Sequence, residues 1–195
     1  VRLQKEPFFY LGAVAPNGEK NLGACSDLDH TRIRGVLSSA FSEKALFLQE
    51  QILIQHADHM VQRIRDLQGK STDAVRWLHH CTYDIISDLS LGSTANTLDC
   101  DSWSPLAHLM FEGIKEGIAV IELLRFLPFK AQMMRLLMSV FGKSRLAAFE
   151  TAVEKAEARM ATDNFERPDF MSYIARANES NRELTQAEIT ANVTL

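Results

Sequence analysis

Residues 26–42 read SDLDHTRIRGVLSSAFS, and this stretch decides the fold of the chain. Ser26 is followed three residues later by Asp29, a pairing that is typical of a capped helix start. Apolar residues then recur at helical spacing, beginning with Ile33 and Val36. The stretch therefore predicts an amphipathic helix that begins directly after its serine cap and buries one apolar face.

The same helical spacing continues through most of the chain. We expect helices on apolar stripes over 53–67 (after a cap at Ser42), 75–89, 106–121 (with Ser104-Pro105 as its start), 130–141, 146–160 and 168–176, and a last helix capped by Thr185 and Glu188. The helix over 75–89 is predicted to start at Ser71 or Thr72 and to end at Gly92. Residues 1–26 show no period and are predicted to be loop, whereas 27–195 are predicted to be helical. The predicted class is all-α, because no alternation of strands and helices is present.

The composition is that of an ordinary folded domain. The 195 residues are 46% hydrophobic and 24% charged, and they include only 9 glycines and 5 prolines, so long helices are favoured over many short strands. A net charge of −4 without a basic stripe argues against a nucleic-acid binder. Three cysteines do not make a complete disulfide framework. No apolar run reaches the roughly 18 residues that a transmembrane helix needs.

His30 and Arg34 are the residues of this first helix that suit a ligand. They stand four residues apart, so both side chains project from one face of the helix. Arginine binds a carboxylate through two parallel hydrogen bonds, and the pair therefore suits one or two carboxylates. Spacing alone favours a simpler alternative, which is a solvated helical face with an ordinary surface histidine.

Four segments of the sequence, in a fixed order, resemble the cytochrome P-450 monooxygenases. They are DHTRIR (29–34) with AFS (40–42), similar to the C helix of that family; TYDIISDLSLG (82–92), similar to its E helix; RPDFM (167–171), similar to the segment before its H helix; and LTQAEITAN (184–192), similar to the start of its I helix. Tyr83 and Leu91 depart from the E-helix pattern, which usually has phenylalanine at both positions. The match is best with fungal members that make secondary metabolites, such as isotrichodermin and averufin hydroxylases.

The resemblance implies a partial cytochrome P-450 fold, from the C helix to the first turns of the I helix, in a single partial domain over 1–195 that is truncated at both ends. In that family the histidine and arginine of the C helix bind the haem propionates, which points to His30 and Arg34. Arg32 faces elsewhere and is a weaker candidate for contact with a redox partner.

The resemblance also implies what the complete enzyme does. It would hydroxylate a small hydrophobic substrate, of the secondary-metabolite kind, with O2 and with electrons from an NADPH-dependent cytochrome P-450 reductase. We expect the complete enzyme at the cytoplasmic face of the endoplasmic reticulum membrane, although this chain contains no anchor.

The residues that carry the chemistry of this family are missing from the sequence. The haem iron is bound by a cysteine thiolate in a loop of the form F-x-x-G-x-x-x-C, and none of Cys25, Cys81 and Cys100 has a glycine four positions before it. We therefore assign no catalytic residue and expect the 195 residues alone to be inactive. The competing hypothesis is a self-contained α-helical interaction module, or a non-catalytic remnant, without a cofactor.

Two local patterns imitate functional sites. Glu122 and Arg125 form an E-x-x-R pattern like that of the family's K helix, but they precede the I-helix-like segment, so we interpret them as part of the F-to-G region. His56 and His59 stand three residues apart, and three further metal-binding side chains lie together at 79–81. No Glu-x-x-His pair accompanies them, so helical-surface histidines are the preferred interpretation over a metal site.

Residues 121–141 are apolar and rich in methionine, with Arg125, Lys130 and Arg135 spaced along them. This composition suits a helix that lies in a membrane interface. It suits a helix buried in a core equally well, so the sequence leaves both alternatives open.

Overall fold

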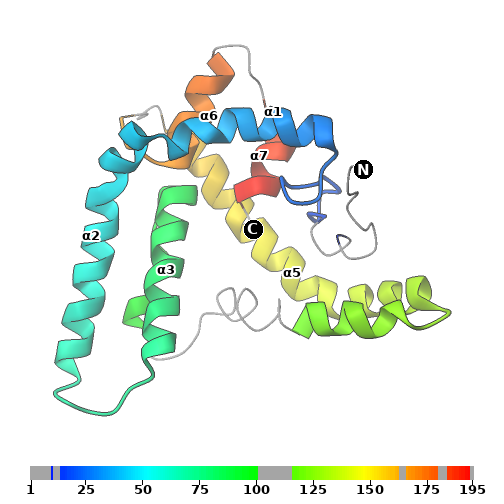
Figure 1. Cartoon of the computed structure of the whole chain (residues 1–195), viewed down its shortest axis with the longest axis horizontal. Coiled ribbons are helices and arrows are strands. Elements are labelled where there is room, and N and C mark those ends of the chain that lie inside the picture. Colours follow the sequence, from blue (N-terminus) through cyan, green and yellow to red (C-terminus); the bar gives the residue numbers. More distant parts are fainter. Residues whose placement is uncertain (1–9, 11–13, 101–115, 163–165, 180–183, 194–195) are drawn as a thin grey trace.

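The computed structural model describes residue 10 and residues 14–100, 116–162, 166–179 and 184–193, and these are mainly helical (Figure 1). The elements are α1 (Asp27–Leu37), η2 (Ser38–Phe41), α2 (Glu43–Asp66), α3 (Ala74–Leu91), η3 (Thr97–Asp99), α5 (Lys130–Met160), α6 (Phe170–Glu179) and α7 (Gln186–Val193). A further helical segment covers 116–125. The strand-like pairing in these ranges is one isolated bridge between Val14 and Lys20. The predicted all-α class is confirmed.

Side-chain caps start several helices where the sequence marks them. The Ser26 hydroxyl accepts a hydrogen bond from the Asp29 N–H at the start of α1, and Ser42 caps α2 in the same way. Thr185 and Glu188 form the predicted capping box before α7, in which each side chain accepts a hydrogen bond from the other residue's backbone N–H. These local bonds fix the entry of the chain into both α1 and α7.

The cap at the start of α3 differs from the predicted one, whereas the residue that ends the helix is the predicted one. The Asp73 carboxylate accepts hydrogen bonds from two N–H groups of the first turn. The predicted start at Ser71 or Thr72 was therefore wrong, because a carboxylate is the stronger acceptor at the positive end of a helix. Gly92 closes α3 with a φ of 66°, as predicted. A Cβ atom at this position would also collide with the side chain of Arg159.

The longest helix, α5, joins two segments that we expected to be separate. The sequence predicts helices over 130–141 and 146–160, whereas α5 runs for 31 residues without a break. Gly142 is the strongest helix breaker between the two segments, and one glycine costs a helix only about 1 kcal/mol relative to alanine. The predicted helix start at Ser104-Pro105 lies outside the described residues.

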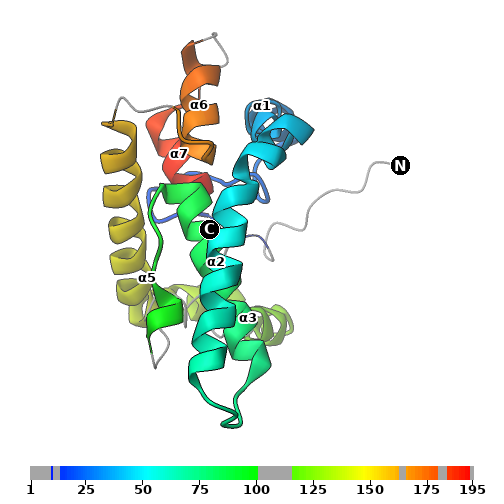
Figure 2. The same cartoon turned by 90° about the vertical axis from the view of Figure 1, so that its left-hand side faces the viewer.

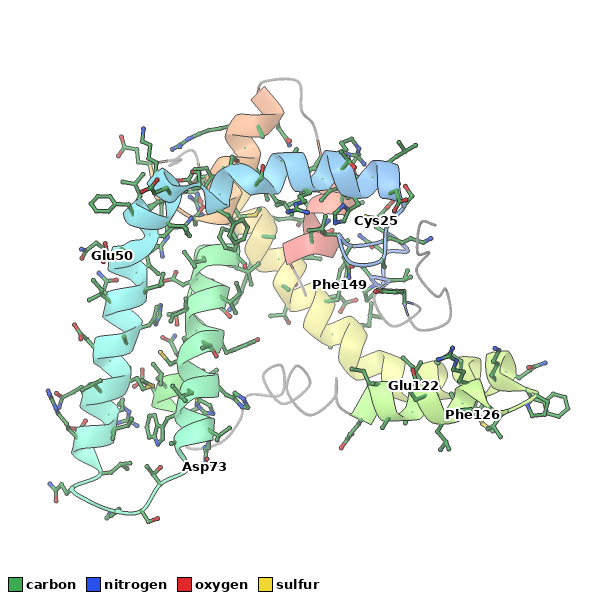
Figure 3. The ribbon with its side chains drawn as sticks, in the orientation of Figure 1. Cys25, Glu50, Asp73, Glu122, Phe126 and Phe149 are labelled. Atoms are coloured by element: carbon green, nitrogen blue, oxygen red, sulfur yellow. The ribbon has the colours of Figure 1, made fainter. Side chains whose placement is uncertain are left out.

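The core lies where α1, α5, α6 and α7 meet beside the end of α3 (Figures 1 and 2). It includes the buried residues Ile33, Val36, Leu91, Ala156, Met171, Ile174 and Ile189. α2 and α3 pack against each other and extend together away from this core. The 116–125 helix and the first turns of α5 project on another side, and Figure 3 shows Phe126 on this projecting part. None of the described helices is long and apolar enough to span a membrane.

Candidate functional site

α1 carries two polar flanks, one on each side of a buried face. Ile33 and Val36 point into the core and have 1% and 2% of their surface exposed. At about 100° per residue, His30 and Arg34 fall on one side of this buried face and Arg32 falls on the other. The helix therefore keeps the predicted pair together and separates Arg32 from it.

His30 and Arg34 are available to a ligand. Neither side chain makes a hydrogen bond or an ion pair within the part of the chain that the structure describes. His30 is half-buried and Arg34 is exposed. A guanidinium and an imidazole together offer donors that match two adjacent carboxylates, such as the propionates of a haem. The donor set fits the carboxylate edge of a haem, and the assignment of these two residues stays a prediction.

Arg32 is held on the opposite flank by the start of α7. Its guanidinium forms a two-point ion pair with Glu188, in which Nη1 lies 3.2 Å from Oε2 and Nη2 contacts Oε1. Nη2 also lies 3.3 Å from Oδ1 of Asp29. The hydrogen bond from Arg32 lowers the pKa of Glu188, although the partial burial of the carboxyl opposes this shift. The structure thus gives Arg32 an internal partner on α7, and its contact with a redox partner stays a prediction.

The first acidic residue of the α3 motif fixes the turn that follows this helix. Asp84 is buried and accepts hydrogen bonds from the backbone N–H groups of Thr97, at 2.8 Å, and Leu98, at 3.0 Å. A ring nitrogen of His80 lies 2.5 Å from the carbonyl oxygen of Thr97. The interpretation of the histidines as surface residues was wrong for His80, because η3 folds back over it and leaves it only 3% exposed.

The second acidic residue of the motif, Asp88, belongs to a network of ion pairs that connects four elements. Asp88 of α3 lies 3.1 Å from Nε2 of His56 on α2 and contacts the guanidinium of Arg167. Arg167 Nε lies 3.5 Å from Asp169, which in turn accepts a 2.7 Å bond from Arg159 of α5. Asp169 is fully buried and the Arg159 side chain is 8% exposed. This network of ion pairs joins α2, α3, α5 and the start of α6.

None of the three cysteines lies in a loop of the form F-x-x-G-x-x-x-C. Cys25 and Cys81 are buried, Cys100 is exposed, and all three are free. Burial, and then the charge of Asp84, raise the pKa of Cys81, so this residue remains a thiol at neutral pH. Within the described ranges no group of three or more His, Cys, Asp or Glu side chains is placed to hold a metal ion.

An apolar groove of about 470 Å³ lies between α2, α3, η2 and α6. The rings of Phe41 and Phe170 meet on its wall, with centroids 5.0 Å apart, and Glu50, marked in Figure 3, lies on its α2 side. His30 and Arg34 are not among the residues that line the groove. The groove is therefore separate from the predicted propionate site.

Sequence reasoning identified several of these residues but not their long-range partners. Glu188 was recognised as part of a capping box, and nothing in its local pattern indicated a bond to Arg32, 156 residues earlier. Arg159 was not singled out, because it lies in an ordinary amphipathic stripe. The signal for its role was indirect: Arg167 and Asp169 belong to a motif, and buried charged residues need partners of opposite charge.

Comparison with known proteins confirms the resemblance. A family model for cytochrome P-450 matches residues 2–195. The chain is 67% identical over 198 residues to the fusicoccadiene 8-ol C-16-hydroxylase of Phomopsis amygdali, covering 100% of this chain and 38% of that protein. It is 50% identical to the fusicoccadiene 8-ol C-16 hydroxylase of Alternaria brassicicola (100% of this chain, 39% of the relative) and 32% identical to the trichothecene C-4 hydroxylase of Trichoderma arundinaceum (86% and 34%).

The chain therefore spans between 34% and 39% of the length of these relatives. The family model covers all but the first of the 195 residues, in agreement with the four ordered motifs and the all-α fold. This chain belongs to the cytochrome P-450 family.

Proposed function

We propose that this chain is part of a fungal haem monooxygenase that hydroxylates a fusicoccadiene alcohol, a hydrophobic terpenoid. The observation that carries the proposal is the 67% identity to the Phomopsis amygdali hydroxylase along the whole chain. The Alternaria brassicicola relative has the same named reaction and is 50% identical, whereas the trichothecene hydroxylase is 32% identical. This order of similarity favours a fusicoccadiene alcohol over a trichothecene. O2 and electrons from an NADPH-dependent cytochrome P-450 reductase would complete the reaction.

In this proposal His30 and Arg34 hold the propionates of the haem. Arg34 would bind one propionate through its planar fork, and His30 would add an N–H donor beside it. These contacts would orient the haem and offset the charge of its carboxylates. The haem supplies the oxygen chemistry when it is bound, and its thiolate ligand would come from polypeptide beyond these 195 residues. The 195 residues alone would therefore be inactive.

The exposed apolar side chains within 121–141 support a membrane contact. Leu123, Phe126 and Phe129 are 69%, 84% and 68% exposed, and the basic residues Arg125 and Lys130 lie among them. A large exposed apolar patch that includes basic side chains suits the surface of a bilayer. We place this patch against the cytoplasmic face of the endoplasmic reticulum membrane. The alternative of a buried core helix requires that polypeptide beyond these 195 residues cover the same patch.

A chimeric enzyme tests the proposed reaction. The matching segment of the Phomopsis amygdali hydroxylase is replaced by these 195 residues, and the chimera is supplied with reductase, NADPH and fusicoccadiene 8-ol. We expect the C-16 alcohol by mass spectrometry, and the red-shifted Soret band of thiolate ligation after reduction and addition of CO. The control chimera carries the matching segment of the trichothecene hydroxylase and should not form this product.

Two other results would contradict the proposal in different ways. A chimera that binds haem but leaves fusicoccadiene 8-ol unchanged would show that the substrate is wrong. A soluble chimera without haem would favour the competing hypothesis, an interaction module or remnant without a cofactor.

A further inference from the structure

We propose that Arg32 and Glu188 are positioning residues for the haem propionates, because their ion pair sets the rotation of α1 about its own axis. This inference rests on the proposed function, in which His30 and Arg34 contact the propionates. Arg32 stands on the flank of α1 opposite to that pair, with the buried face between them. A rotation of the helix that moves Arg32 therefore moves the two propionate residues as well.

The ion pair adds a directional contact to the packing beneath it. Two nitrogens of Arg32 contact the two carboxylate oxygens of Glu188, and this geometry specifies an angle as well as a distance. The apolar residues of both helices, including Ile33 and Ile189, belong to one core cluster. Close packing of these side chains holds α1 against its neighbours, and the ion pair adds a contact on the outer flank of the helix. The ion pair therefore adds an angular constraint on α1 at this point.

Both partners of Arg32 are themselves fixed at helix starts. Glu188 accepts a 2.9 Å bond from the Thr185 N–H, and its side chain is only 13% exposed. Asp29, the second partner of Arg32, accepts a 2.6 Å bond from the hydroxyl of Ser26. Arg32 therefore links the cap of α1 to the cap of α7 across 156 residues of sequence.

The N-terminal loop ties α7 to the same region. The amide of Asn17 donates a 3.1 Å bond to the carbonyl oxygen of Ala187, and the Leu22 N–H donates a 2.7 Å bond to the side chain of Asn192. With α7 held in this way, Glu188 is a fixed reference point for α1. Loss of the ion pair would remove this constraint from α1 and leave α7 in place.

An ordinary surface ion pair is the alternative explanation, and the two differ in what they affect. The Arg32 side chain is 42% exposed, and ion pairs with such exposure contribute little to overall stability. A positioning role predicts a small change in unfolding together with a clear change at the propionates. A merely structural role predicts changes in unfolding alone.

The test uses the chimeric holoenzyme with Arg32→Ala, Glu188→Gln and the double variant. Glutamine keeps the capping box of α7 but removes the charge. Three quantities are measured: the rate of haem transfer to excess apomyoglobin, the propionate bending bands of the resonance Raman spectrum, and the urea midpoint. Arg63→Ala is the matched control, because Arg63 also joins two elements, with its Nε 3.2 Å from the Leu98 carbonyl oxygen.

We expect Arg32→Ala to accelerate haem loss about fivefold and to shift the propionate bands, with a nearly unchanged urea midpoint. The double variant should lose haem no faster than Arg32→Ala, and Arg32→Lys should recover part of the effect because it keeps the charge without the fork. Unchanged propionate bands in Arg32→Ala, or an equal effect of Arg63→Ala, would overturn the inference while the proposed function stands. An unsubstituted chimera without haem would overturn both.

Discussion

Removal of the Arg159 guanidinium should lower the free energy of unfolding by about 3 kcal/mol. Asp169 is fully buried and accepts a 2.7 Å bond from Arg159, together with two 2.9 Å bonds from the N–H and the hydroxyl of Ser172. Breaking a buried ion pair by removing one partner costs about 3–5 kcal/mol, because the remaining charge stays in a medium of low dielectric constant. The two Ser172 bonds and the Arg167 contact at 3.5 Å persist in Arg159→Met and still stabilise the carboxylate, which places the expected cost at the lower end.

The assay is urea unfolding of the chimera, followed by far-ultraviolet circular dichroism. Arg125→Met is the control, because Arg125 pairs with Glu122 at 3.6 Å on an exposed surface, and its loss should cost less than about 1 kcal/mol. The double variant Arg159→Met/Asp169→Asn should cost less than the sum of its two single variants, since it removes the stranded charge. Equal costs for Arg159→Met and Arg125→Met, or strict additivity in the double variant, would refute the reasoning.

Three further predictions concern other parts of the fold. Gly92→Ala should lower the free energy of unfolding by about 1–2 kcal/mol because the left-handed backbone disfavours a side chain, and by more because the new Cβ atom collides with Arg159. A urea midpoint equal to that of the parent would contradict this. Asp84→Asn should lower the free energy of unfolding by about 1–3 kcal/mol, because the new amide NH2 can face the Leu98 N–H, which now donates a hydrogen bond to Asp84. Faster hydrogen exchange in η3 would report the change, and unaltered exchange would count against it. The pKa of Glu188 is lowered in the folded chain, so its contribution to stability is present above its ordinary value of 4.5 and is lost as the pH falls through the folded-state value. Glu188→Gln should therefore flatten the acid limb of stability against pH, and an acid limb as steep as that of the parent would exclude this role.

The helices could be predicted from the sequence where their boundaries are set locally. Ser26, Ser42 and the Thr185–Glu188 box each bond a backbone group within three or four residues, so a short window contains the whole signal. Gly92 was predictable for the same reason, since its φ depends on its own lack of a side chain. The single helix α5 was not predicted. The pattern of apolar residues shifts near Gly142, and such a shift resembles a helix break whether or not the helix continues.

The contacts between distant segments could not be predicted in this way. His80 is buried because η3 folds over it, and the Arg32–Glu188 and Arg159–Asp169 pairs depend on how helices pack. Each residue carries a local pattern that fits a surface position equally well, so the sequence indicates only that buried charges must find partners. The candidate propionate pair was found because two features coincide: its four-residue spacing and its place in a family motif.

Haem retention by the chimera tests the central claim most directly. Arg34→Ala removes a charge-assisted hydrogen bond worth about 1.5–3 kcal/mol, so haem loss to apomyoglobin should accelerate roughly tenfold to a hundredfold. Arg34→Lys should recover part of this effect, and His30→Ala should be milder because a neutral imidazole offers one uncharged donor. Haem loss from Arg34→Ala at the rate of the surface control Arg125→Ala would contradict the assignment of α1 as the propionate-binding helix.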